Sequence, residues 1–387
     1  MLRQIASALS ASAIPSPGPA DRVLLFAPHP DDESIATGGL LAAAGRAGAA
    51  VRIVIATSGE NNPWAQRAFE RRVILFTRHR LRFAARRERE ALAAVAELGV
   101  ASESVVFLRL PDQGLTPLLL RDAAFFVSRL GSEIARFAPT LVLTPAAVDV
   151  HPDHSALAIA CELALAQRAG ADPPSRRLAY VVHGPGARHT RFPYLPLDDA
   201  DLRAKRAAIA RHESQLVLRG GFLRSFAAKA EPYSEVAVPP PGPPHPIERA
   251  RWARGGLALG LRPRRTARAF GPAMLRLLPA GATSGALSIP LPRNRGGVEL
   301  TIWATGSPVG RGEIRRAGSH LEVVLPDHLV AGNQPLFAKL ERRWGFFDEA
   351  GWVRLERPRD GGEDGKVAAG DGGPAEFDGP SAELPRG

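Results

Sequence analysis

Two short apolar runs, each ending in a loop of His and Asp, constrain this chain more than any other feature of its sequence. The run Val23–Phe26 is followed by the loop Ala27–Glu33, and then by a segment rich in small and apolar residues. A short apolar run that stops at Pro and polar residues is typical of a buried strand leading into a loop. Open α/β sheets place their sites at the carboxyl ends of such strands.

The second run, Leu141–Thr144, leads to the sequence His-Pro-Asp-His that begins at His151. Pro152 suits the first turn of a helix over Ser155–Gln167, so His151 and His154 are expected on one side of that turn. His and Asp suit zinc, and a metal relieves the repulsion between adjacent carboxylates. Either loop alone is more typical of a cap or a surface turn, but together they favour a mononuclear metal site.

Further apolar runs alternate with helical patterns in the first part of the chain. This succession predicts an α/β fold, namely a Rossmann-like, mostly parallel sheet with helices on both faces. The expected strands also include Val51–Ala56, Val105–Leu108 and Leu178–His183, and the expected helices include Arg86–Leu98, Asp122–Phe137 and Leu202–Gln215.

The composition changes at a Pro-rich stretch, after which short alternating runs predict a small β-rich C-terminal module. We therefore expect five parts: a disordered lead-in (1–20), a catalytic α/β domain (21–238), a Pro-rich linker (239–262), the β-rich module (263–357) and a disordered tail (358–387).

The formal net charge of +11 indicates either a generally basic surface or attraction to anions such as sugar phosphates or an anionic membrane face. Nucleic acid is disfavoured because no zinc-finger, helix-turn-helix or aromatic-basic signature is present. The single cysteine, Cys161, excludes an intramolecular disulfide. No apolar run is long enough to span a bilayer, and the N-terminus is a poor signal peptide, so we expect a cytoplasmic protein.

The motifs Pro-His-Pro-Asp-Asp-Glu and His-Pro-Asp-His, taken together, resemble those of the PIG-L/LmbE-like family of zinc-dependent N-deacetylases. The resemblance covers roughly residues 20–240. Three weaker marks support it: Thr57–Glu60 after the second strand, the helical set Arg87, Glu90, Ala94, Leu98 and Gly99, and Leu110–Leu115 after the third strand.

The resemblance implies one Zn²⁺ per chain, bound by His29, Asp32 and His154 with a position left for water. It makes Asp31 the general base. His151, as an imidazolium, is expected to stabilise the oxyanion and to protonate the amine. The remaining roles are an imidazole-orienting carboxylate, Asp153, and two substrate-binding residues, Arg87 and Asp112. From spacing alone, Arg87 fits an ordinary helix ion pair with Glu90, and Asp112 fits a turn.

The function expected from these residues is metal-activated hydrolysis of the N-acetyl group of an amino sugar or its conjugate, as in an N-acetylglucosaminyl deacetylase. An amidase acting on a thiol-sugar or other amide, and a non-catalytic carbohydrate-binding protein, remain alternatives. Arginines gather in residues 63–87, as a solvated basic helix or as a flap that attracts a phosphate-bearing or lipid-linked substrate. The oligomeric state and the identity of the sugar stay open.

Overall fold

The computed structural model describes residues 13–167, 174–184, 193–235, 245–253, 256–262, 274–280, 285–292, 298–317, 320–330, 335–342 and 346–357. The predicted α/β architecture is confirmed by a five-stranded parallel sheet in the order β3-β2-β1-β4-β5. Its strands are β1 (Arg22–Ala27), β2 (Ala50–Thr57), β3 (Val105–Leu110), β4 (Leu141–Pro145) and β5 (Arg176–Tyr180).

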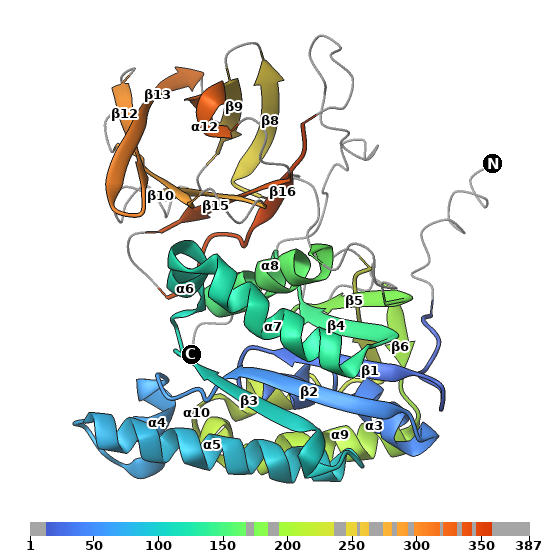
Figure 1. The fold of residues 1–387 in the computed structure, drawn as a ribbon. Coiled ribbons are helices and arrows are strands. Elements are labelled where there is room, and N and C mark those ends of the chain that lie inside the picture. Colours follow the sequence, from blue (N-terminus) through green and yellow to red (C-terminus); the bar gives the residue numbers. More distant parts are fainter. Residues whose placement is uncertain are drawn as a thin grey trace, which may run out of the picture.

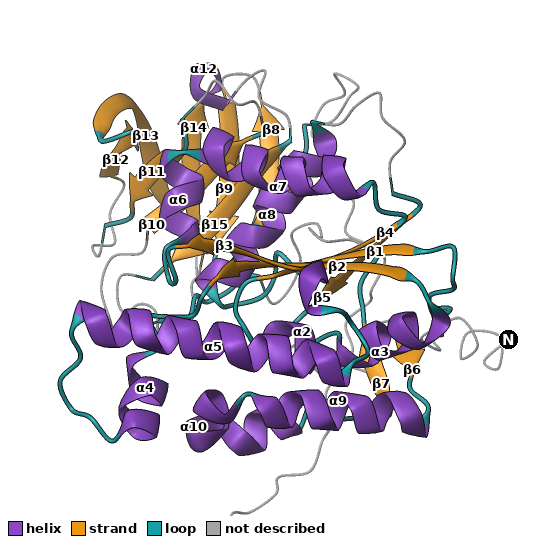
Figure 2. Ribbon diagram, turned by 60° about the horizontal axis from the view of Figure 1, so that its bottom comes forward, coloured by secondary structure: helices purple, strands orange, loops and turns teal. Residues whose placement is uncertain are grey.

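Helices cover both faces of this sheet (Figure 2). One face carries α2 (Asp32–Ile35), α3 (Gly38–Ala47) and α5 (Thr77–Glu97), with α4 (Pro63–Glu70), α9 (Asp199–Arg211) and α10 (Glu213–Arg224) beyond them. The other face carries α6 (Leu115–Arg121), α7 (Ala123–Phe137) and α8 (Pro152–Ala166). Val23 and Leu25 point into the apolar core between the sheet and helices α3 and α5, the first core. Leu24 and Phe26 point into the core between the sheet and helices α6, α7 and α8, the second core. Burial on both faces explains why this strand is apolar at successive positions.

The C-terminal module is β-rich, as predicted, and is built on a nine-stranded antiparallel sheet in the order β16-β15-β10-β11-β12-β13-β14-β9-β8. Strands β8 and β15 also contact each other, so the sheet curls towards a barrel around its own apolar core. The strands are β8 (Ile247–Ala253), β9 (Gly256–Leu261), β10 (Met274–Pro279), β11 (Leu287–Pro290), β12 (Val298–Ala304), β13 (Ser307–Ala317), β14 (His320–Pro326), β15 (Leu336–Glu341) and β16 (Val353–Leu355).

Short elements complete the described chain: η1 (Ser102–Ser104), α12 (Asp327–Val330) and a two-stranded sheet of β6 (Tyr194–Pro196) and β7 (Ala230–Pro232). No helix within the described ranges is both long and apolar enough to cross a membrane.

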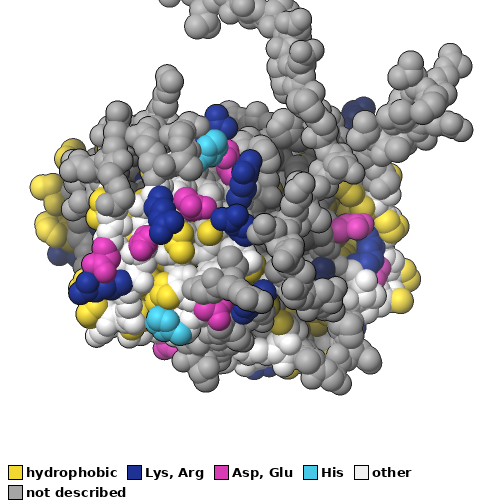
Figure 3. Space-filling model, turned by 90° about the horizontal axis from the view of Figure 1, so that it is seen from above, with side chains coloured by type: hydrophobic (Ala, Val, Ile, Leu, Met, Phe, Trp, Pro, Cys, Tyr) yellow, Lys and Arg dark blue, Asp and Glu magenta, His cyan; other side chains and the backbone are white. Residues whose placement is uncertain are grey.

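The module rests on the α6 and α8 side of the α/β domain (Figure 1). Leu278, Phe337 and Trp352 of the module belong to the same buried cluster as the apolar residues of α8. Seen from above, the molecule carries side chains of opposite charge next to one another (Figure 3). Two exposed ion pairs of the module are Arg311–Glu299 and Arg251–Glu322. The module is therefore joined to α8 by a buried apolar cluster, beside which Arg354 of β16 pairs with Glu162 of α8.

The structure differs from the expected boundaries at two places. Ala13 forms a bridge with Tyr194, and Ile14 is buried in the first core, so the lead-in is structured from residue 13. Strands β8 and β9 occupy the second half of the predicted linker, because Leu257, Leu259 and Leu261 alternate into the core of the module. The predicted disordered segments 1–12 and 358–387 lie outside the described residues.

Candidate active site

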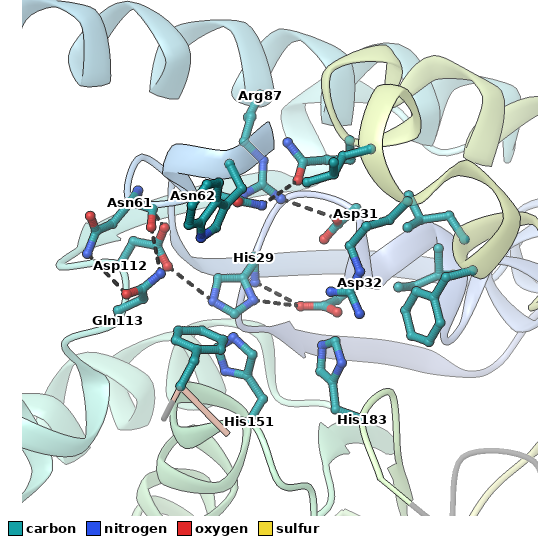
Figure 4. Close-up of a pocket in the computed structure, with 18 of the residues that line it drawn as sticks. His29, Asp31, Asp32, Asn61, Asn62, Arg87, Asp112, Gln113, His151 and His183 are labelled. Carbon is teal, nitrogen blue, oxygen red and sulfur yellow. Dashed lines mark hydrogen bonds and ion pairs between the residues drawn. The ribbon is translucent and has the colours of Figure 1, made fainter. Parts of the chain in front are cut away.

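The site lies where the strand order of the parallel sheet reverses. The chain passes from β1 outward to β3 and returns to place β4 on the other side of β1, which makes the β1/β4 edge the switch point of the sheet. His29, Asp31 and Asp32 follow β1, and His151 follows β4. These residues face one another across a pocket of about 430 Å³ (Figure 4).

Three buried side chains converge at the floor of this pocket. The ligand atoms of His29, Asp32 and His154 all lie within 4.8 Å of one another. Oδ2 of Asp32 is 3.3 Å from Nδ1 of His29 and 3.4 Å from Nε2 of His154. Donors that sit about 2.0–2.2 Å from a tetrahedral zinc ion are roughly 3.3–3.6 Å apart, so the distances from Asp32 to the two histidines fit zinc.

His154 supplies a second indication of a metal site. It is fully buried, yet neither of its ring nitrogens has a hydrogen-bond partner among the described residues. Leaving a buried polar atom unpaired is costly, and a metal ion at Nε2 would remove that cost. On the opposite side of the ring, Oδ2 of Asp149 lies 3.3 Å from Nδ1. A carboxylate in this place orients a metal-binding imidazole and raises its basicity.

A second group, His29, His151 and Asp153, has the same close spacing. Its oxygens are already engaged, because Asp153 accepts hydrogen bonds from the backbone N–H of Gln113 at 2.7 Å and of Leu115 at 3.0 Å. Nδ1 of His151 accepts a hydrogen bond from the N–H of Asp153. Neither ring nitrogen of His154 has such a hydrogen bond within the described part of the chain, which favours His29, Asp32 and His154 as the donor set.

Two carboxylates fix the orientation of His29. Its Nε2 lies 3.3 Å from Oδ1 of Asp112 and 3.4 Å from Oδ2 of Asp153. Burial disfavours the charged form of His29, but hydrogen bonds with Asp112, Asp153 and Asp32 raise its pKa well above the ordinary value. Asp153 and Asp112 thus both contact the imidazole of His29. With Nε2 held in this way, Nδ1 faces Asp32.

The adjacent aspartates have different surroundings. Burial alone would raise the pKa of Asp32, but the charges and hydrogen bonds of His154 and His29 lower it. Burial raises the pKa of Asp31 to about 6, against the opposing charge of Arg87. Asp31 has the positive φ angle of 141°, which is rare outside Gly and is best tolerated by Asp and Asn. The loop therefore separates two neighbouring carboxylates, because Asp32 faces His29 and His154 whereas Asp31 faces Arg87.

Arg87 joins the loops that line the pocket. Its Nη2 lies 3.2 Å from Oδ2 of Asp31, and its guanidinium donates hydrogen bonds to the carbonyls of Pro30 at 2.6 Å and Gly59 at 3.0 Å. The helix ion pair with Glu90 is not formed, because Glu90 instead accepts hydrogen bonds from the N–H and hydroxyl of Ser214. Arg87 still lines the pocket, next to Asp31.

His151 is buried beside other imidazoles, and burial together with His29 and His154 lowers its pKa well below the ordinary value. This environment favours the neutral ring over the expected imidazolium. Since Nδ1 accepts the hydrogen bond from the N–H of Asp153 at 3.2 Å, the proton of the neutral ring is on Nε2. His151 is consequently a hydrogen-bond donor through Nε2.

Sequence reasoning missed three contributors. Asp149 lies two residues before His151, so its place in the same strand-end loop was the available signal. Phe346 and Phe347 line the pocket from the C-terminal module. No local pattern connects a Phe pair to a motif that far away in the chain, so only the tertiary structure brings them together.

Comparison with known proteins is consistent with these observations. Residues 24–165 match the profile of the family described as PIG-L: GlcNAc-PI de-N-acetylase. No curated protein matches the chain significantly.

Three solved structures are similar to this chain. A conserved protein from Thermus thermophilus has 25% identity and a TM-score of 0.43, over 57% of this chain and 96% of that one. The pseudoaglycone deacetylase Dbv21 has 25% identity and a TM-score of 0.40, over 52% and 85%. The N,N'-diacetylchitobiose deacetylase from Pyrococcus horikoshii has 22% identity and a TM-score of 0.43, over 56% and 84%. Together with the motifs after β1 and β4, the profile match identifies residues 24–165 as a PIG-L-family segment, of the deacetylase class of hydrolases.

Proposed function

We propose that the protein is a zinc-dependent hydrolase that removes the N-acetyl group from an N-acetylated amino sugar or its conjugate. The observation that carries the proposal is the buried group His29, Asp32 and His154, together with the carboxylate of Asp31, which lines the same pocket as His29 and Asp32. Three protein ligands with an open position are typical of catalytic zinc. Bound there, zinc would supply Lewis acidity and lower the pKa of water towards about 7.

The residues around this group supply proton transfer and stabilisation of the negative charge on the carbonyl oxygen. Asp31 takes the proton of the attacking water, and Arg87 holds its carboxylate in place from 3.2 Å. Nε2 of His151 donates a hydrogen bond to the carbonyl oxygen as that oxygen gains negative charge. The C–O bond forms, the C–N bond breaks, and the nitrogen leaves with the proton that Asp31 received. The products are acetate and a free amine.

Polar groups on the β2 and β3 side of the pocket suit a sugar. Asn61, Asp112 and Gln113 line this side (Figure 4), and hydrogen bonds between them hold the two loops together. The amides of Asn61 and Gln113 both donate and accept hydrogen bonds and the carboxylate of Asp112 accepts them, which matches sugar hydroxyls. We place the sugar ring against this wall, with its acetamido group towards His29.

The proposed activity is tested by measuring acetate release. N-acetylglucosamine, its glycosides and other N-acetylated conjugates are incubated with protein loaded with one equivalent of zinc, with chelator-treated protein as the control. We expect acetate and a stoichiometric amine from at least one amino sugar, and loss of both products with the chelator. Turnover of thiol-sugar or other amides alone would favour the amidase. Binding of sugars without release of acetate would favour a carbohydrate-binding protein.

The basic segment after α4, residues 71–80, favours a lipid-linked substrate over a substrate whose phosphate is bound by several arginines in the pocket. Among the clustered arginines only Arg87 lines the pocket, so the others do not contact a phosphate bound there. Instead, Arg71, Arg72, Arg78 and Arg80 are exposed, as are Val73 at 82%, Ile74 at 64% and Phe76 at 54%. Exposed apolar residues interleaved with Arg are typical of contact with an anionic membrane surface. We propose peripheral attraction to the anionic cytoplasmic face of a membrane.

This attraction predicts that vesicles containing anionic lipid sediment the protein at low salt, whereas neutral vesicles do not. Replacement of Val73 and Ile74 by Ser should weaken the sedimentation several-fold. Replacement of the exposed Val298 and Val309, on β12 and β13 of the C-terminal module, by Ser is the matched control. Equal sedimentation with both kinds of vesicle, or self-association that depends on Val73 and Ile74, would show that the segment has another partner.

A further inference from the structure

The C-terminal module reaches into the pocket of the α/β domain through one segment, Phe346–Trp352. We propose that this segment, which we call the strap, completes the substrate site, and that its two Phe residues form a subsite for an apolar group carried by the substrate. The inference rests on the proposed function and names the class of substrate: a polar amino sugar joined to an alkyl, acyl or aromatic group.

The strap is fastened to the loop that carries the site residues after β4. The N–H of Asp348 donates to the carbonyl of Val150 at 2.9 Å, and the N–H of Trp352 donates to the carbonyl of Ala147 at 2.7 Å. A Cβ atom on Gly351 would lie 1.7 Å from the carbonyl oxygen of Ala147, so only Gly permits this approach. The backbone of the strap and the loop of Asp149 and His151 are therefore in direct contact.

The module holds the strap from its other side. Nζ of Lys339 on β15 is fully buried and lies 2.6 Å from Oδ2 of Asp348. The same ammonium is 5.6 Å from the ring centre of Trp352, which is itself completely buried in the interface with α8. Removing either partner of a buried ion pair leaves an uncompensated charge, so this arrangement resists displacement of the strap.

These anchors direct two aromatic rings onto the imidazoles of the site. The Phe346 ring is 4.7 Å from the His151 ring in an edge-on geometry, and the Phe347 ring is 5.2 Å from the His183 ring. The two Phe rings contact each other, with centroids 5.0 Å apart. The pairs Phe346–His151 and Phe346–Phe347 are edge-on, a favourable geometry for aromatic rings at these distances, and the pair Phe347–His183 is tilted.

The strap makes one side of the pocket mouth apolar. Phe346 is 42% exposed although it is a large aromatic side chain, and Trp64 at 68% and Leu218 at 50% line the same pocket from α4 and α10. Exposed apolar residues gathered at a concave site, above a few placed polar groups, are characteristic of ligand binding. An amphipathic ligand fits this division, with its sugar on Asp112 and its apolar group against the Phe pair.

The experiment compares substrates that differ only in the apolar group. One series is methyl, butyl and octyl glycosides of N-acetylglucosamine, and the other is N-acetyl, N-butanoyl and N-octanoyl glucosamine. The full-length protein is compared with the Phe346→Ala/Phe347→Ala double variant and with Phe125→Ala, a matched control on α7 that is 45% exposed. Phe346→Leu/Phe347→Leu restores apolar volume, and thermal melts show that the variants are folded.

In wild type, kcat/KM should rise with chain length in one of the two series. In the Ala variant, the ratio of kcat/KM for the longest chain to that for the shortest chain of this series should fall about tenfold. The Leu variant should recover most of it, and the Phe125 variant should keep all of it. The responding series shows whether the apolar group is the aglycone or the acyl chain.

Equal preference in wild type and the Ala variant, in both series, would overturn the proposal. The strap can also be tested apart from catalysis, by titrating octyl and methyl glucosamine glycosides into wild type and the Ala variant. If no substrate is hydrolysed but octyl binding still depends on Phe346 and Phe347, the proposed function fails and the strap stands. If substrates are hydrolysed but neither hydrolysis nor octyl binding depends on Phe346 and Phe347, the proposed function stands and the strap proposal fails.

Discussion

Replacing Asp31 by Asn is expected to lower kcat by about 10²–10⁴, the usual contribution of a general base, while zinc binding persists. The amide cannot accept the proton of the attacking water, whereas it can occupy the unusual backbone conformation, since Asn also tolerates positive φ. Asp31 lies outside the group His29, Asp32 and His154, so its replacement removes no proposed ligand. Acetate release and zinc content are measured on the same preparation.

Two variants make the result specific. Asp199→Asn, at an exposed position of α9, is the control for loss of one carboxylate and should leave activity and zinc unchanged. Asp32→Asn should lose zinc as well as activity. If Asp31→Asn loses the metal and Asp32→Asn retains it, the roles of the neighbouring aspartates are reversed. Near-normal acetate release from Asp31→Asn with full zinc content would exclude Asp31 as the base.

Replacing His154 by Ala is expected to abolish stoichiometric zinc binding and to reduce acetate release to the chelator-treated level. The two ring nitrogens face the carboxylates of Asp32 and Asp149 at 3.4 and 3.3 Å, so a loss of zinc must be separated from a loss of folding. Asp149→Asn should act in the same direction but less, by about 10–100-fold in zinc affinity, because Asp149 acts on the metal through His154.

The control for His154→Ala is His328→Ala, an exposed histidine of α12 that should have no effect on zinc. Zinc content is measured by elemental analysis after gel filtration, and thermal melts establish that each variant is folded. A folded His154→Ala protein that binds one equivalent of zinc with unchanged affinity would contradict the proposed ligand set.

The sequence predicts most of the α/β domain because its signals are local. A strand buried on both faces is a run of apolar residues, and β1 shows this directly, since Leu24 and Leu25 point into different cores. The loops after β1 and β4 are near each other in any parallel sheet with a switch point between these strands, which brings His29 and His154 together without knowledge of the remainder. The approach of the proposed metal ligands thus follows from the strand order of the sheet.

The features that could not be predicted depend on tertiary contacts. Strands β8 and β9 follow directly on a Pro-rich stretch. The Pro content of that stretch led to the prediction of a linker over both strands, although Leu257, Leu259 and Leu261 alternate as in a strand. The exposed side of the basic segment depends on how α4 packs against α10, which sequence spacing does not define. The Phe346–Phe347 pair reaches His151 only because the module docks on α8, and the hydrogen bond that defines the tautomer of His151 comes from the folded turn at Asp153.

The central claim is that the metal lies between β1 and β4, on His29, Asp32 and His154. Its most direct test is a crystal of the zinc-loaded protein measured on both sides of the zinc absorption edge. The account predicts one anomalous peak about 2.0–2.2 Å from Nδ1 of His29, a carboxylate oxygen of Asp32 and Nε2 of His154. A peak centred instead on His29, His151 and Asp153, or a fully zinc-loaded protein with no peak in this pocket, would contradict it.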